Sequence, residues 1–132
     1  MAKLYESGEN YLETILMLHL HENFVRAVDI AHEMDVSKPS VSRAMGILRD
    51  GGFINIADDG NITLTDSGKE VAERIYERHL VLSHWLMDLG VSPETAVEDA
   101  CKMEHDISVE SFQALKNHLR KAHPNVQLDF EQ

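Results

Sequence analysis

The segment "EDACKMEHDIS", residues 98–108, places three side chains that can bind a transition metal close together. Cys101 is the only cysteine of the chain, and Glu104 and His105 follow it by three and four positions. In a helix these spacings put a thiol, a carboxylate and an imidazole on one face. Such ligands suit divalent metals such as Fe²⁺, Co²⁺, Ni²⁺ or Zn²⁺. Three neighbouring ligands leave a site incomplete, so further ligands must come from other segments.

The obvious further ligands lie far away in the sequence. Asn10 and Glu13 share one face of a helix near the N-terminus, and His79 lies in a long helical segment. A second interpretation needs no metal: Cys101 would be a small core residue, and Glu104 and His105 would be solvated helix surface. The residues alone leave both interpretations open.

Catalysis has little support in the sequence. The chain contains no H-E-x-x-H, no G-x-S-x-G, no glycine loop for phosphate and no paired cysteines. A nucleophilic Cys101 with His105 as its base would place both groups four residues apart on one helix, an unusual arrangement. We therefore do not expect an enzyme.

Composition and charge limit the possible partners. The 132 residues are 43% hydrophobic and 27% charged, enough for one domain or two small ones. One cysteine and no signal or membrane segment predict a cytoplasmic protein. The net charge of −11 disfavours nucleic acid, yet "VSKPSVSRAMGILR" contains Lys38, Arg43, Arg49 and no acid. This basic stretch is equally typical of a solvated helix face.

The first half of the chain predicts a winged helix. A short helix through residues 27–36 precedes a second helix, which begins at the cap Ser37 and ends at residues 51–52. "FINIADDGNITLT" alternates apolar and polar residues around a turn at Gly60, as a β-hairpin does. A helix-turn-helix followed by a hairpin forms a winged helix. We expect these residues to face DNA: Ser37, Lys38, Pro39, Ser40, Ser42, Arg43 and Arg49.

The second half predicts helices only. Thr65 caps a long helix over residues 66–89, Ser92 caps the helix that carries residues 98–108, and Ser108 caps the last one. Ser7 is expected to cap the first helix of the chain. The fold class is therefore mainly α: a winged helix-turn-helix with a small hairpin wing in residues 1–70, then an all-helical domain in residues 71–132. The long helix has more apolar positions than a winged domain of this size can cover alone, which indicates pairing with a second copy.

The order of these parts resembles the diphtheria toxin repressor and manganese transport regulator family of metal-dependent transcriptional repressors, in its short form without an SH3-like domain. The similarity runs through "ENYLETILML", "DIAHEMDVSKPSVSRAMGILRDGGFI", "LTDSGKEVAERIYERHLVL" and "EDACKMEHDIS". The resemblance implies a homodimer that binds a palindromic double-stranded DNA operator when a divalent metal is bound, and no further protein partner. Genes of iron or manganese homeostasis are the usual targets.

The resemblance also implies a set of metal ligands. Matched position by position to the family's motifs, they are Cys101, Glu104, His105, His79, Glu13 and Asn10. A cysteine at position 101 is typical of iron-responsive members, whereas Glu13 and His79 match the manganese type. We expect Fe²⁺ first and Mn²⁺ next, with Co²⁺, Ni²⁺ or Zn²⁺ able to substitute in vitro.

We hypothesise that the metal acts as a switch. Acidic groups such as Glu13 and Glu104 would repel one another without metal, and a cation would tie the first helix to the helical half. One alternative is a winged-helix regulator that senses a non-metal signal, with residues 98–108 purely structural. Another is a metal-carrying or catalytic protein whose winged helix serves protein contacts.

Overall fold

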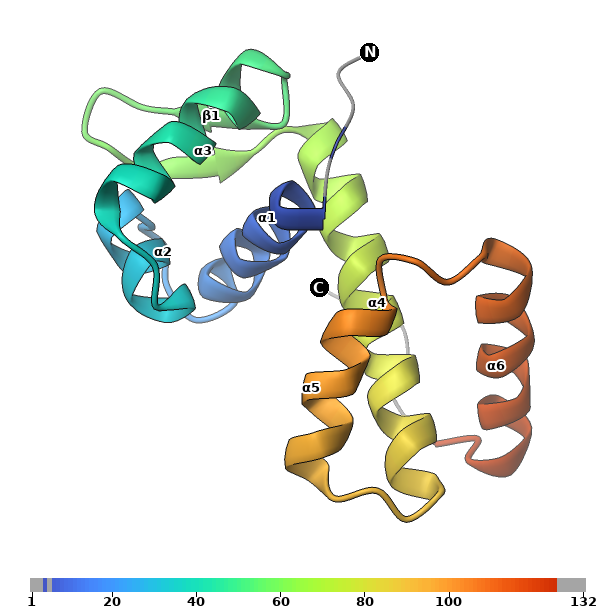
Figure 1. Ribbon diagram of the computed structural model, residues 1–132. Helices are drawn as coiled ribbons and strands as arrows, with labels where there is room; N and C mark the ends of the chain where they lie inside the picture. Colours follow the sequence, from blue (N-terminus) through green and yellow to red (C-terminus); the bar gives the residue numbers. More distant parts are fainter. Residues whose placement is uncertain (1–3, 5, 126–132) are drawn as a thin grey trace. The chain divides into compact units, whose positions relative to one another are not determined.

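The computed structural model describes residue 4 and residues 6–125 (Figure 1). In this part of the chain, six helices and one hairpin follow in the order α1 (Glu6–His19), α2 (Ala27–Met34), α3 (Lys38–Asp50), β1 (Ile54–Ile56), β2 (Ile62–Leu64), α4 (Asp66–Asp88), α5 (Pro93–Met103) and α6 (Val109–Ala122). The mainly helical fold class with a small hairpin is confirmed. Contacts divide the chain into an N-terminal unit, Met1–Glu73, and a C-terminal unit, Arg74–Gln132.

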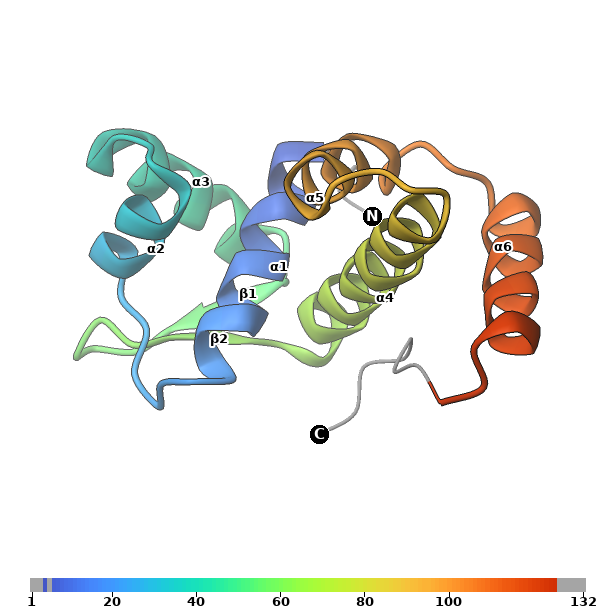
Figure 2. The ribbon, with the colours of Figure 1, turned by 90° about the horizontal axis from the view of Figure 1, so that it is seen from below.

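The N-terminal unit is a helix-turn-helix with a wing. Within it α1 packs against α2, α3 and β2, and Figure 2 shows α1 beside the hairpin. Strands β1 and β2 pair antiparallel, with Ile54 opposite Leu64 and Ile56 opposite Ile62. The core is aliphatic and includes Leu12, Ile15, Val25, Ile30, Val41, Met45, Ile54 and Ile62. Burial of these side chains supplies the main stabilisation of so small a unit.

Side-chain caps start four of the helices where the sequence predicts them. The capped amides and their distances to the capping oxygen are Ser40 N to Ser37 Oγ at 3.3 Å, Gly68 N to Thr65 Oγ1 at 3.2 Å, Thr95 N to Ser92 Oγ at 3.4 Å, and Ser111 N to Ser108 Oγ at 3.1 Å. Each cap satisfies an amide that has no partner inside its helix. The prediction for the first helix was wrong: α1 already includes Glu6, so Ser7 is a helical residue and not a cap.

The wing is held to the segment before α2. Its strands have three residues each, and an isolated hairpin of that size is marginal in water. The Val25 amide donates to Asn61 Oδ1 at 3.0 Å, and the Ile62 amide donates to the Val25 carbonyl at 2.8 Å. Gly60 has a φ of 91°, as the predicted turn requires. The hairpin therefore depends on contacts outside its own two strands.

The start of α4 is packed closely against the residue before β1. The Thr65 amide donates to the Phe53 carbonyl oxygen at 3.1 Å. Gly68, in the first turn of α4, lies against the same carbonyl, with no room for a Cβ atom. This contact fixes where α4 leaves the N-terminal unit.

The C-terminal unit consists of the rest of α4 with α5 and α6. Its core joins Val81 of α4 to Phe112 and Leu119 of α6, and Trp85, Ile107 and Leu115 pack around them. Gly90 ends α4 with a φ of 98°, a left-handed conformation that favours glycine. Among the described residues, none of the helices has the length and apolar character to cross a membrane.

Candidate metal centre and DNA-binding surface

Glu104 is the centre of a polar group inside the C-terminal unit. It is the C-cap residue of α5, and none of its surface is exposed. The prediction that Cys101, Glu104 and His105 all lie on one helix was wrong, because α5 ends at Met103 and His105 lies in the following turn. The interpretation of Glu104 as solvated surface was wrong as well. A buried carboxylate is costly unless other groups or a cation compensate its charge.

Two imidazoles lie beside the two oxygens of this carboxylate. His79 Nδ1, from α4, is 3.1 Å from Glu104 Oε2. His105 Nε2 is 3.6 Å from Glu104 Oε1, and the His105 side chain is only 2% exposed. Oε1 accepts no hydrogen bond from any residue that the structure describes. The structure thus brings together three of the predicted ligands from two segments.

The other three predicted ligands lie on α5 and α1. Cys101 is exposed on α5, so it is not the buried core residue of the metal-free interpretation. Asn10 and Glu13 lie one turn apart on α1, in the N-terminal unit. For all six residues the role of metal ligand stays a prediction.

A buried oxygen without a hydrogen-bond donor, next to two imidazoles, fits a divalent cation. Imidazole nitrogens and carboxylate oxygens are ligands of Fe²⁺, Mn²⁺ and Zn²⁺ in proteins. The same atoms would be a poor arrangement without a cation, because Oε1 gives up its hydration and gains no donor among the described residues. The donor set therefore fits the kind of metal that the sequence predicts.

Arg78 is a residue of this region that the sequence analysis missed. Its side chain is 8% exposed, and Nη1 donates to the carbonyl oxygens of Glu104 at 3.1 Å and Ile107 at 2.8 Å. Its guanidinium carbon lies 5.4 Å from the centre of the Phe112 ring. No side-chain pattern could reveal these contacts, because both hydrogen-bond acceptors are backbone atoms more than twenty positions away. Its place directly before His79 was the one available signal.

The residues predicted to meet DNA form an exposed surface on α3 and the turn before it. All seven are exposed: Ser37, Lys38, Pro39, Ser40, Ser42, Arg43 and Arg49. Ser37 caps the helix and also donates to Ser40 Oγ at 2.8 Å. Arg49 Nε lies 3.4 Å from Asp50 Oδ1, an exposed pair that reduces the positive charge at this end of α3. The surface is accessible, and contact with DNA stays a prediction.

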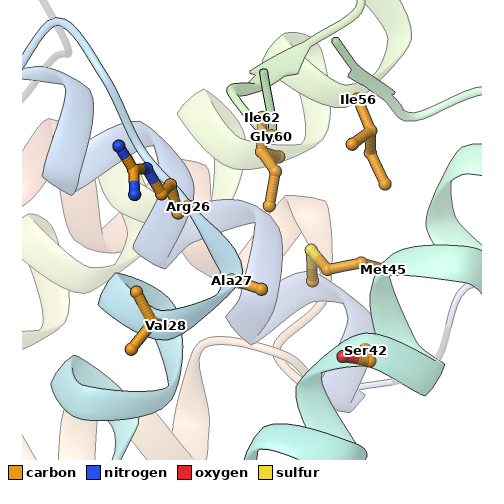
Figure 3. A pocket seen from close by; sticks show the side chains of 8 residues that line it. All are labelled: Arg26, Ala27, Val28, Ser42, Met45, Ile56, Gly60 and Ile62. Carbon is orange, nitrogen blue, oxygen red and sulfur yellow. The ribbon is translucent and has the colours of Figure 1, made fainter. Parts of the chain in front are cut away.

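An apolar cleft of about 430 Å³ separates α3 from the wing in the N-terminal unit (Figure 3). Met45 of α3 and Ile56 and Ile62 of the hairpin point into it. The guanidinium of Arg26, another lining residue, stacks on Phe24 at 4.8 Å from the ring centre. None of the eight lining residues offers a carboxylate, imidazole or thiol, so the cleft is not a second metal site.

Two family models together match most of the chain. The model of the "iron dependent repressor, N-terminal DNA binding domain" matches residues 3–61. The model of the "iron dependent repressor, metal binding and dimerisation domain" matches residues 65–126. The boundary between the two matches lies near the start of α4.

Individual relatives are named as regulators or repressors. The chain is 37% identical over 106 residues to the transcriptional regulator MntR of Salmonella typhimurium, covering 80% of this chain and 68% of that protein. It is 29% identical over 109 residues to the iron-dependent repressor IdeR of Mycobacterium tuberculosis, covering 82% and 47%. The structure of the manganese regulator SloR superposes with a TM-score of 0.78 at 26% identity, covering 91% of this chain and 55% of SloR. The chain thus spans about half the length of IdeR and SloR.

Proposed function

The chain belongs to the iron-dependent repressor family of metal-dependent transcriptional regulators, which includes the diphtheria toxin repressor and the manganese transport regulators, and from this premise we propose how it acts. It binds a palindromic DNA operator as a homodimer when a divalent metal is bound, and so represses genes of metal homeostasis. The observation that carries this proposal is the buried Glu104 carboxylate between two imidazoles, in a chain that begins with a winged helix.

His79, Glu104 and His105 form the centre of the proposed metal site in the C-terminal unit. The distance of each imidazole to the Glu104 carboxylate and the buried Glu104 Oε1 support this assignment. Cys101, Glu13 and Asn10 are the further ligands that we propose, from their match to the family's motifs. Asn10 would offer an amide oxygen, whereas Glu13 would offer a second carboxylate.

Fe²⁺ is the metal that we propose first, followed by Mn²⁺. Two imidazoles with one carboxylate form a donor set known for Fe²⁺ in proteins, and the Cys101 thiol shifts preference away from the harder Mn²⁺. Relatives that are named for manganese and for iron support both metals as candidates. Co²⁺, Ni²⁺ and Zn²⁺ follow as substitutes in vitro.

The switch follows from the charges of the proposed ligands. A bound cation supplies the positive charge that offsets the repulsion between the carboxylates of Glu13 and Glu104. Glu13 belongs to the N-terminal unit and Glu104 to the C-terminal unit. A cation bound by both carboxylates would therefore couple the DNA-binding unit to the C-terminal unit. Homodimerisation through residues 71–132 would set the distance between two α3 helices. The DNA partner and the single cysteine support a cytoplasmic location.

The test of this proposal is operator binding with and without metal. DNA duplexes selected from a random pool with the Mn²⁺-loaded protein serve as the operator probe. Adding Mn²⁺ or, anaerobically, Fe²⁺ is expected to raise affinity for the selected duplex roughly 5- to 150-fold, the usual range of allosteric coupling. Fluorescence anisotropy measures both affinities.

Each rival function predicts a different result in the same assay. A regulator of a non-metal signal retains the selected duplex with equal affinity in both conditions. A metal carrier or enzyme with a winged helix for protein contacts selects no duplex sequence at all. Either result contradicts the proposed function.

Arg43→Ala is expected to weaken binding to the selected duplex by about 1–3 kcal/mol, or roughly 5- to 150-fold. Arg43 is exposed on α3 and meets either a guanine edge or a phosphate. Anisotropy titrations at several salt concentrations separate the two contacts. Loss of discrimination against scrambled DNA indicates base contact, and a uniform loss with a lower salt slope indicates phosphate contact. Unchanged affinity would remove Arg43 from the interface. Arg49→Ala is expected to weaken binding less than Arg43→Ala, because Arg49 already pairs with Asp50.

A further inference from the structure

We propose that Arg78 is the positioning residue of the metal centre, fixing the turn that carries Glu104 and His105. This inference rests on the proposed function, because it assigns a role toward the same site. Arg78 is not a ligand itself, since a guanidinium is a permanent cation with no acceptor atom. It acts through the backbone of the turn between α5 and α6.

The turn is held at both of its ends by one nitrogen. Arg78 Nη1 donates to the carbonyl oxygens of Glu104 and Ile107, at 3.1 and 2.8 Å, and His105 lies between these two residues. The Glu104 carbonyl belongs to the C-terminal end of α5, where carbonyls have no partner within the helix. The buried Arg78 guanidinium therefore donates hydrogen bonds to acceptors that water would otherwise have to reach. The backbone on either side of His105 is fixed as a result.

Arg78 also connects this turn to the two neighbouring helices. It extends from α4, one residue before the ligand His79, and its guanidinium stacks over Phe112 of α6. One side chain thus relates the positions of His79 on α4 and of Glu104 and His105 on the turn. Outer groups that orient ligands in this way commonly change metal affinity 10- to 100-fold when they are removed.

The chemistry of the contact requires arginine. Two carbonyl oxygens and an aromatic ring around one flat group suit a guanidinium, which offers paired donors in a fixed plane and stacks on rings. A lysine ammonium is compact and strongly hydrated, and it would reach the carbonyls without stacking. We therefore expect Arg78→Lys to restore part of the function that Arg78→Met removes.

A matched control lies one residue earlier on α4. Glu77 pairs with the buried Lys116 of α6. The double variant Glu77→Gln, Lys116→Met removes this charged pair between α4 and α6 and keeps the Arg78 hydrogen bonds to the turn. If this variant and Arg78→Met lose similar thermal stability, a difference between their Mn²⁺ affinities reflects the positioning of the turn and not general destabilisation.

Two measurements test the proposal, one of them without metal. Isothermal titration with Mn²⁺ is expected to give a Kd roughly 10- to 100-fold higher for Arg78→Met, an intermediate Kd for Arg78→Lys, and an unchanged Kd for the control. Hydrogen–deuterium exchange of the metal-free protein is expected to be faster across residues 104–108 in Arg78→Met than in wild type or control.

Unchanged Mn²⁺ affinity in Arg78→Met, or an equal loss in the control, would overturn the proposal. Wild-type protein that binds no Mn²⁺ contradicts the proposed function. In that case the exchange rates still decide on Arg78, because unchanged exchange across residues 104–108 rules out a fixed turn.

Discussion

Replacing Glu104 with alanine is expected to abolish the effect of Mn²⁺ on operator binding while the chain stays folded and dimeric. The buried Glu104 carboxylate lies between His79 and His105, and its Oε1 atom has no hydrogen-bond donor among the described residues. Removing it takes away the charge that would attract a cation to the C-terminal unit. The ratio of operator affinities with and without Mn²⁺ should fall from roughly 5- to 150-fold to about 1. Anisotropy titrations measure the ratio, and gel filtration measures the oligomeric state.

Glu98→Ala is the matched control for this experiment. Glu98 is an exposed carboxylate on α5, so its loss changes the net charge equally without touching the buried group. This variant should keep the full metal response. Glu104→Gln, which keeps the size of the side chain, should behave like Glu104→Ala. A Glu104→Ala protein that responds to Mn²⁺ as strongly as wild type would remove Glu104 from the site.

The second large effect is expected from Gly68→Ala, which should lower the free energy of unfolding by about 3 kcal/mol or more. A Cβ atom at position 68 would lie 2.0 Å from the Phe53 carbonyl oxygen and 3.0 Å from its carbonyl carbon. Both are backbone atoms, and the Thr65 amide holds the same oxygen in place. The start of α4 would have to move away from the residue before β1. Urea denaturation followed by circular dichroism measures the loss.

Gly46→Ala makes the same chemical change in the middle of α3 with the opposite expected sign. No atom beyond the helix's own backbone lies within 4 Å of a Cβ at this position. Alanine is therefore expected to stabilise α3 by about 0.5–1 kcal/mol, the usual difference between the two residues in a helix. Similar losses from both substitutions would show that the contact with Phe53 is not the cause.

Much of the fold could be predicted because its signals are local. The helix starts at Ser37, Thr65, Ser92 and Ser108 follow from a hydroxyl that can accept an amide two or three residues later. The turn at Gly60 follows from the need for positive φ between two alternating strands. Membership of the family was also predicted correctly from four short segments in order. These features depend on residues that are close in the sequence.

The candidate site was harder to predict because it depends on distant residues. The helical spacing of Cys101, Glu104 and His105 does not reveal that α5 ends at Met103, so that Glu104 lies at the cap and His105 in the turn after it. Nor does it reveal that Glu104 is fully buried. Arg78 carries no motif, since it bonds to backbone carbonyls of a segment that only the fold brings near.

The wing of this protein is not a module that could be exchanged by itself. Its alignment depends on Val25, which lies 36 positions or more before the residues that it contacts. The Val25 amide donates to Asn61 Oδ1, and the Val25 carbonyl accepts from the Ile62 amide. A chimaera that received only a foreign hairpin would need an acceptor side chain at position 61 to keep the wing in register. Asp58, at the tip, takes part in neither of these two hydrogen bonds. The charge at position 58 can therefore change while the base of the wing stays in register.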